Sequence, residues 1–190
     1  MERSSSEAQA LRGARNGDAS AFGLLVQSYQ EAAFRAAYLI LHDAQAAEDV
    51  AQEGFVRAYR QLHRFREEDP FRPWLLRIVT NLALNETRRR KRGLALLDRF
   101  GRQAPRLSPG PERIVTTSEE TREVWQAINR LPQDDRLILY LRYFLELSEA
   151  EMARVIERPA GTVKSRLHRA GRRLKTIVET DYPHLRLPDD

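Results

Sequence analysis

The sequence predicts an all-α protein in which two small helical domains are joined by a flexible linker. Apolar residues recur at spacings of three and four along most of the chain, the period of a helix with one buried face, and no segment alternates as a strand would. The run SPGP at residues 108–111 breaks any helix between two such stretches. We therefore assign residues 1–93 and 119–176 to the domains, residues 94–118 to the linker and residues 177–190 to a tail.

Composition narrows the classes of function. The chain has 190 residues and a formal net charge of +5, which favours an acidic partner such as nucleic acid or an anionic membrane surface. Its apolar runs are too short to cross a bilayer and its polar start lacks a signal peptide core, so we expect a cytoplasmic protein without membrane insertion. Cysteine is absent and the four histidines lack ligand spacing, so we expect no disulfide, metal or cofactor. We find no set of acid, base and nucleophile that would indicate an enzyme.

The first domain is expected to hold three helices. Asp18 is a candidate N-cap for a helix that runs to about His42. A second helix should span about residues 44–63 and a third about residues 70–92. In the second domain, two further helices are expected over residues 119–130 and 133–144, with Leu131 and Pro132 as the break between them.

The third helix combines an apolar face with a polar face that suits nucleic acid. Leu75, Ile78 and Val79 cluster on one side, and Asn81 and Asn85 lie about 120° away together with Arg77, Arg88 and Arg92. Asparagine can pair with a base edge, and arginine can bind phosphate or guanine. The run RRRKR at residues 88–92 repels itself unless an anion neutralises it, although it could also be a solvated helix end.

The loop before this helix mixes aromatic and charged residues. Phe65 could stack on an unpaired base, which would favour an opened strand over a duplex. Trp74, next to Leu75, suits the core better than such a stacking role. In the second helix Glu48, Asp49, Gln52 and Glu53 form an acidic surface that would repel DNA, so it either meets a protein or is the wet side of the helix.

Residues 148–175 have the pattern of a helix-turn-helix. Ser148 and Glu151 have the spacing of a capping box, and Pro159 ends one helix but suits the start of the next. In the second of the two helices, Val163, Leu167, Ala170 and Leu174 form a buried stripe. The opposite face is basic, and no acidic residue lies between Arg158 and Lys175 to neutralise it, which suits a polyanion. It holds Thr162, Lys164, Ser165, Arg166, Arg169, Arg172 and Arg173.

Taken in order, these segments resemble the extracytoplasmic-function (ECF) sigma factors of bacterial RNA polymerase. The resemblance rests on AEDVAQEGFVRAYR, on FREEDPFRPWLLRIVTNLALNETRRRKR and on the stretch from LPQDDRLILYLRYF to the end of the helix-turn-helix. It runs collinearly from about Ser20 to Lys175, and the whole series is far more specific than the helix-turn-helix alone. It implies that the first domain is sigma region 2 and the second is sigma region 4.

The resemblance also implies roles for matching residues. The −35 element would be recognised in duplex DNA by Thr162, Val163, Lys164, Ser165, Arg166, Arg169 and Arg173. The −10 element would be captured as the DNA melts by Phe65, Arg77, Asn81, Asn85, Arg88 and Arg89. The β′ clamp helices of core RNA polymerase would bind Asp49, Gln52 and Glu53. The β flap would meet Leu141, Tyr143 and Phe144, residues that could equally be core, and an anti-sigma factor would regulate the chain.

The function expected from the resemblance is to bind core RNA polymerase, direct it to promoters through their −35 and −10 elements and promote promoter opening. A helix-turn-helix repressor or activator that works without polymerase, and a basic RNA-binding protein, are the alternatives. The repressor or activator would need no acidic surface, and the RNA-binding protein would show no promoter dependence. The promoter sequence, the inducing signal and the identity of an anti-sigma factor do not follow from the sequence.

Overall fold

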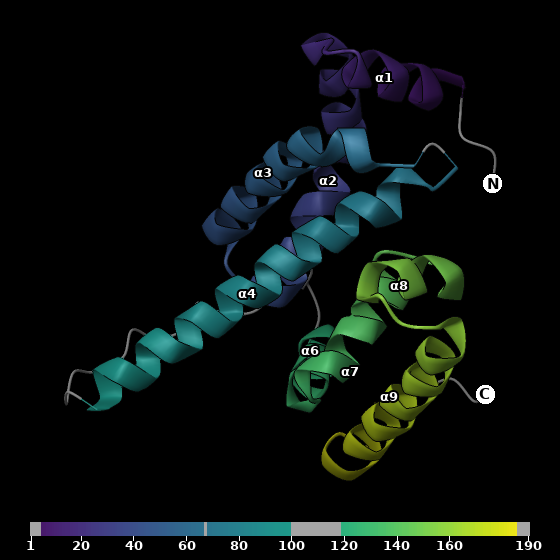
Figure 1. The fold of residues 1–190 in the computed structure, drawn as a ribbon. Coiled ribbons are helices and arrows are strands. Elements are labelled where there is room, and N and C mark those ends of the chain that lie inside the picture. The colour runs from purple at the N-terminus through teal and green to yellow at the C-terminus, as the bar shows by residue number, and fades with distance from the viewer. Residues whose placement is uncertain (1–4, 67, 100–118, 186–190) are drawn as a thin grey trace. The chain divides into compact units, whose positions relative to one another are not determined.

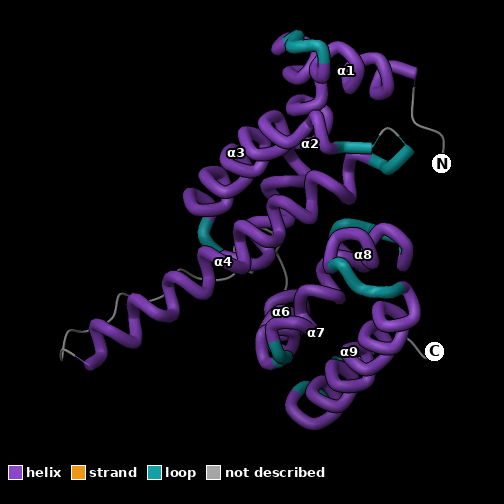
Figure 2. Tube along the Cα trace, viewed as in Figure 1, coloured by secondary structure: helices purple, strands orange, loops and turns teal. Residues whose placement is uncertain are grey.

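The computed structural model describes residues 5–66, 68–99 and 119–185, and its chain divides into two compact units, residues 1–107 and 108–190 (Figure 1). Within the described ranges, every regular element is helical and short turns join most of the helices (Figure 2). The predicted all-α class is therefore confirmed for this part of the chain.

The first unit is a bundle arranged around one long helix. Helix α2 (Ala19–Leu41) packs against α1 (Ser5–Arg15), α3 (Ala44–Gln61) and α4 (Phe71–Arg99), and α3 also packs on α4. A 3₁₀ turn, Leu62–Arg64, follows α3. The apolar faces of these helices meet in one core, whose buried residues include Leu11, Leu25, Ala33, Ala37, Phe55, Leu62, Phe71, Leu75, Leu76 and Val79.

Two aspartates fix the starts of α2 and α3. The Asp18 carboxylate accepts hydrogen bonds from the backbone N–H groups of Ser20, at 2.8 Å, and Ala21, which confirms the predicted cap. The Asp43 carboxylate caps α3 in the same way, by accepting from the N–H of Ala46 at 3.1 Å. Each cap satisfies backbone donors that the first turn of a helix leaves without partners.

The second unit holds the helix-turn-helix. It consists of α6 (Glu119–Arg130), α7 (Gln133–Leu139), a π-helical turn (Tyr140–Phe144), α8 (Glu149–Ile156) and α9 (Ala160–Asp181). Helix α9 packs against α6, α7 and α8. The core of this unit is formed by Trp125, Ile128, Ile138, Leu141, Leu147, Met152, Val155, Val163, Ala170 and Val178.

One helix and two helix ends differ from the sequence-based expectation. Helix α1 was not predicted, because its buried residues Ala10, Leu11 and Ala14 span barely one turn of apolar pattern. Helix α4 continues to Arg99, into the residues assigned to the linker. Helix α9 continues past Lys175 to Asp181, where Val178 is buried, so the start of the assigned tail belongs to the bundle.

Candidate nucleic-acid interface

The turn of the helix-turn-helix has the geometry that the sequence predicted. The Ser148 hydroxyl accepts from the N–H of Glu151 at 3.3 Å, and the Glu151 carboxylate accepts from the N–H of Ser148 at 2.9 Å, which completes the capping box. Helix α8 ends at Ile156 and is capped by Glu157, whose φ of 52° lies in the left-handed region, and Pro159 occupies the N-cap position of α9. The capping box and the tight turn between Ile156 and Ala160 are confirmed.

Helix α9 presents a basic face to solvent because its apolar stripe anchors it to the rest of the unit. Val163, Ala170 and Val178 are buried, and Leu174 is half-buried. The exposed or partly exposed polar residues are Thr162, Lys164, Ser165, Arg166, His168, Arg169, Arg172 and Arg173.

Val163 does not belong to this exposed face. Its side chain is fully buried in the core of the second unit, so the structure overturns its assignment as a residue that contacts the −35 element. The reason is its position on the stripe shared with Ala170. A residue cannot fill the core and reach a base edge at the same time.

Two arginines of α9 already have acidic partners on α7. Arg166 Nη1 lies 3.6 Å from Asp134 Oδ2, and Arg173 Nη1 donates to Asp135 Oδ2 at 2.5 Å. These acids lie on α7, far from α9 along the chain, so only the tertiary structure brings them to the basic face. The basic face is therefore partly neutralised from within the protein.

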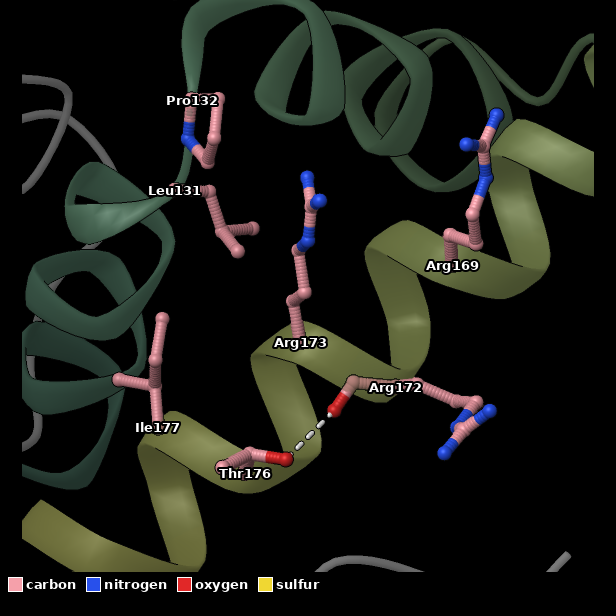
Figure 3. A pocket seen from close by; sticks show the side chains of 7 residues that line it. All are labelled: Leu131, Pro132, Arg169, Arg172, Arg173, Thr176 and Ile177. Atoms are coloured by element: carbon pink, nitrogen blue, oxygen red, sulfur yellow. Dashed lines mark hydrogen bonds between the residues drawn. The ribbon is translucent and has the colours of Figure 1, made fainter.

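A groove of about 450 Å³ lies between the α6–α7 junction and α9. Its apolar side is formed by Leu131, Pro132 and Ile177, and Arg169, Arg172 and Arg173 line it as well (Figure 3). In this view Arg169 and Arg173 extend toward α7, whereas Arg172 points away from them (Figure 3). The exposed arginines of α9 therefore form two groups: Arg169 and Arg173 face α7, and Arg172 does not.

Helix α4 carries the second candidate interface, in the first unit. Asn81 and Asn85 are exposed and lie one turn apart, and Arg88 is exposed one turn further along. Arg88 Nη1 donates to Asn85 Oδ1 at 3.2 Å. The buried residues Leu75, Leu76, Val79 and Ala83 hold the opposite side of α4 in the core, so the polar face stays directed to solvent.

The basic run at residues 88–92 of α4 is neutralised in part by two carboxylates. Glu86 accepts from Arg89 Nε at 2.7 Å and from Arg90 Nε at 3.0 Å, and Arg90 Nη1 also donates to Asp43 at 3.1 Å. The hydrogen bond from Arg89 lowers the pKa of Glu86, and the hydrogen bond from the N–H of Ala46 lowers the pKa of Asp43. The run at residues 88–92 is thus less self-repelling than its sequence indicates.

Phe65 is also removed from the candidate interface. Its side chain is only 2% exposed, and its ring lies 5.0 Å from that of Trp74 and 5.7 Å from that of Phe71, measured between centroids. The three aromatic side chains pack on one another, and the buried Phe65 ring is therefore not available to stack on a base. The expectation that Trp74 suits the core agrees with these contacts.

Helix α3 displays the predicted acidic surface together with apolar residues that sequence reasoning missed. Asp49, Gln52 and Glu53 are exposed, and Val56 and Tyr59 on the same side of the helix are 43% and 40% exposed. The Tyr59 ring packs on Phe22, with the ring centroids 4.9 Å apart. The available signal was their spacing, since Val56 lies four residues after Gln52 and Tyr59 lies three residues after Val56. A mixed acidic and apolar helix face is typical of a protein-binding surface.

Leu141, Tyr143 and Phe144, the residues expected to meet the β flap, differ in their exposure. Leu141 is buried and Phe144 packs on Trp125, whereas Tyr143 is 67% exposed. Tyr140 is buried, and burial raises its pKa to about 12, so its phenol stays neutral. Of the three residues expected at a protein contact, Tyr143 alone offers a largely exposed side chain.

The described ranges offer neither a metal site nor a membrane-spanning helix. No group of histidine, cysteine, aspartate or glutamate side chains there has the arrangement of a metal site. No described helix combines the length and the apolar character that a membrane span requires.

Two sequence families match the chain over the two units. Residues 25–93 match Sigma-70 region 2, and residues 121–174 match Sigma-70 region 4. The first match contains the polar face of α4 and the acidic face of α3, and the second contains the helix-turn-helix.

Relatives of similar length share this organisation. The RNA polymerase sigma-H factor of Pseudomonas aeruginosa is 40% identical over 170 residues, which cover 85% of this chain and 88% of the relative. The ECF RNA polymerase sigma factor SigW of Bacillus subtilis is 32% identical over 179 residues, which cover 87% and 92%.

Solved structures agree at the level of the fold. CnrH, in complex with the cytosolic domain of CnrY, superposes with a TM-score of 0.69 and 27% identity, over 93% of this chain and 99% of that chain. The sigma factor RpoE of Bartonella quintana, in complex with the anti-sigma factor NepR, gives a TM-score of 0.67 over 84% and 98%, and at 23% identity it supports the fold alone. The matches to both sigma regions, together with relatives that align along nearly their whole length, establish that the chain belongs to the extracytoplasmic-function sigma factors of bacterial RNA polymerase.

Proposed function

We propose that this sigma factor divides promoter recognition between its two units. The observation that carries the proposal is the presence of two exposed polar helix faces, one on α4 within the region 2 match and one on α9 within the region 4 match. In the proposal residues 119–176 bind the −35 element as duplex DNA, residues 1–93 bind core polymerase and the opened −10 element, and residues 94–118 join them. The chain acts in the cytoplasm as a non-enzymatic factor.

The −35 contacts are assigned to the start and middle of α9. Insertion of its first turns into the major groove, about 12 Å wide, would present Thr162, Lys164 and Ser165 to base edges or phosphates. Arg166 and Arg169 follow on the next turn. Arg173 contributes mainly by holding α9 on α7, because its guanidinium is engaged by the buried Asp135.

The −10 contacts are assigned to the exposed side of α4. The amides of Asn81 and Asn85 can both donate to and accept from a base edge, which suits the capture of a base released from the duplex. Arg77, Arg88 and Arg89 would bind the backbone of the same strand. Since Phe65 is buried, base stacking at this surface must come from other residues or be absent.

We assign the contact with core polymerase to the exposed side of α3. Asp49 and Glu53 supply negative charge, and Gln52, Val56 and Tyr59 supply contact area between and beside them. We further assign Tyr143 to the contact with the β flap. Because CnrH was solved with the cytosolic domain of CnrY, we also expect a separate protein to regulate this chain by binding it.

The proposal is tested by transcription with purified core polymerase on a library of genomic promoter fragments. The wild-type chain should produce specific initiation. Arg166→Ala should weaken initiation from promoters that depend on the −35 element, whereas Asn81→Ala should reduce the permanganate reactivity of −10 thymines while duplex −35 binding is retained. Asp49→Lys should weaken binding to core polymerase and leave the fold unchanged.

Matched controls separate these effects from general changes in charge. Arg122→Ala on α6 removes an exposed arginine away from the reading face, and Gln27→Ala truncates an exposed amide on α2. Both should behave as wild type. Folded wild-type protein that never supports specific initiation with active core would refute the proposal, and normal transcription by both Arg166→Ala and Asn81→Ala would refute the residue assignments.

A further inference from the structure

The two ion pairs between α7 and α9 differ in a way that bears on DNA binding. Asp134 and Asp135 both lie in the first turn of α7, which packs directly against α9. Asp134 faces Arg166, and Asp135 faces Arg173. Although they are neighbours in sequence, the environments of the two carboxylates are opposite.

The ion pair between Arg173 and Asp135 is stable because its carboxylate is buried. The Asp135 side chain is only 9% exposed, and its oxygen accepts a short, 2.5 Å hydrogen bond from Arg173. Opening this pair would leave a buried carboxylate without its counter-charge, which is strongly destabilising. Arg173, whose own side chain is 57% exposed, therefore stays paired with Asp135 whether or not DNA is bound.

The ion pair between Arg166 and Asp134 is weak and can open at little cost. Its closest N–O distance of 3.6 Å exceeds that of a charge-assisted hydrogen bond, and the Asp134 side chain is 71% exposed. Exposed pairs of this kind contribute little to stability and are screened by salt. The Asp134 carboxylate would stay hydrated if Arg166, whose own side chain is 28% exposed, turned toward an outside anion.

We propose that Asp134 is an intramolecular competitor of DNA for Arg166, so that it lowers the affinity of α9 for duplex DNA and weakens its salt dependence. This inference rests on the proposed role of α9 at the −35 element. In the free protein the Asp134 carboxylate stands where it neutralises Arg166. When Arg166 binds a phosphate, Asp134 loses its partner and takes up a cation from solution.

The uptake of this cation has a defined thermodynamic consequence. Binding of a phosphate by arginine releases counterions from DNA, which makes the affinity fall steeply with salt. Cation uptake at Asp134 offsets part of that release. A neutral side chain at residue 134 removes the offset and also removes a negative charge beside the approaching phosphates.

The test uses the full chain bound to core polymerase and two short duplexes, one containing the −35 region of a promoter that the wild-type holoenzyme transcribes and one of mixed sequence. Asp134→Asn should tighten binding by about 1.5- to 5-fold, the range expected for an exposed ion pair. It should also steepen the log–log salt dependence by up to about 0.9, the contribution of one phosphate. A role of Asp134 in folding alone would not change this slope.

Two further variants make the test specific. Glu120→Gln on α6 causes the same change in net charge at an exposed residue and should leave affinity and slope unchanged. In an Arg166→Gln background, Asp134→Asn should have a smaller effect, because the competitor then has no arginine to hold and only its repulsion of the phosphates is removed. Thermal melts of each variant verify that the second unit remains folded.

The inference is wrong if Asp134→Asn leaves binding unchanged or weakens it, or if it tightens binding equally in the Arg166→Gln background. A failure of the proposed function has a different signature. In that case the wild-type holoenzyme would not prefer the promoter duplex to the mixed-sequence duplex, while the effect of Asp134 on mixed-sequence DNA could still be measured.

Discussion

Replacing Gly54 with alanine should force apart α3 and α4, the helices that carry the proposed polymerase and −10 surfaces. A Cβ atom at residue 54 would lie 2.6 Å from Val79 Cγ2, whereas carbon atoms in ordinary contact are about 3.5–4.0 Å apart. The helices or the Val79 side chain must therefore shift by about 1 Å. Overpacking of this kind costs about 1–3 kcal/mol, and the better helix propensity of alanine recovers about 1 kcal/mol. We expect a net loss in the free energy of unfolding of up to about 2 kcal/mol.

A double-mutant cycle isolates the contact with Val79. Val79→Ala alone should destabilise the first unit by at least about 1.6 kcal/mol, because two buried methyl groups are lost. In that background Gly54→Ala should become stabilising by about 1 kcal/mol, since the space is now open and only the propensity gain remains. The coupling energy between the two substitutions is then about 1–3 kcal/mol in favour of the double variant.

Urea unfolding followed by tryptophan fluorescence measures this cycle. The chain has two tryptophans, so a Trp125→Phe background leaves Trp74 as a reporter of the first unit. Gly23→Ala on α2 is the matched control, because a Cβ there meets nothing within 4 Å, and it should stabilise the first unit by about 1 kcal/mol. Additive effects of Gly54→Ala and Val79→Ala within about 0.5 kcal/mol would refute the proposed close packing.

Two other predictions concern the caps. Ser148→Ala removes the capping box of α8 and should lower the free energy of unfolding of the second unit by about 0.5–2 kcal/mol, as followed by Trp125 fluorescence in a Trp74→Phe background; an unchanged midpoint would contradict the cap. The pKa values of Asp43 and Glu86 lie below their ordinary values of 3.8 and 4.5, so their contribution to stability is complete above those values and is lost as the pH falls through the lower folded values. Asp43→Asn keeps a side chain able to cap α3 but removes the charge, so urea midpoints of the first unit should fall less steeply below about pH 4.5 than in wild type; an equally steep fall would exclude Asp43 as a source of the acid sensitivity.

The difference between successful and failed predictions has a local explanation. The cap at Asp18, the capping box at Ser148 and the break at Pro159 were predictable because the interactions involved lie within three residues of one another. The burial of Phe65 was not, because it depends on how the loop after α3 folds back against Phe71 and Trp74. Val163 illustrates a different limit, since a sequence motif marks its segment as DNA-binding without stating which side of the helix each residue occupies.

The sequence by itself determined the all-α class, the helix-turn-helix and the family, because helix periodicity, caps and motif order are properties of residues near one another along the chain. The tertiary structure alone decided which charges are available. Arg173 is engaged by Asp135, Arg166 is shared with Asp134, and Arg90 joins Asp43 to the end of α4. These pairs connect residues about 30 to 50 positions apart, and electrostatic interactions depend on distance in space rather than along the chain. A run of basic residues therefore shows where DNA could bind, and only the packing of the helices shows which of those residues are free to bind it.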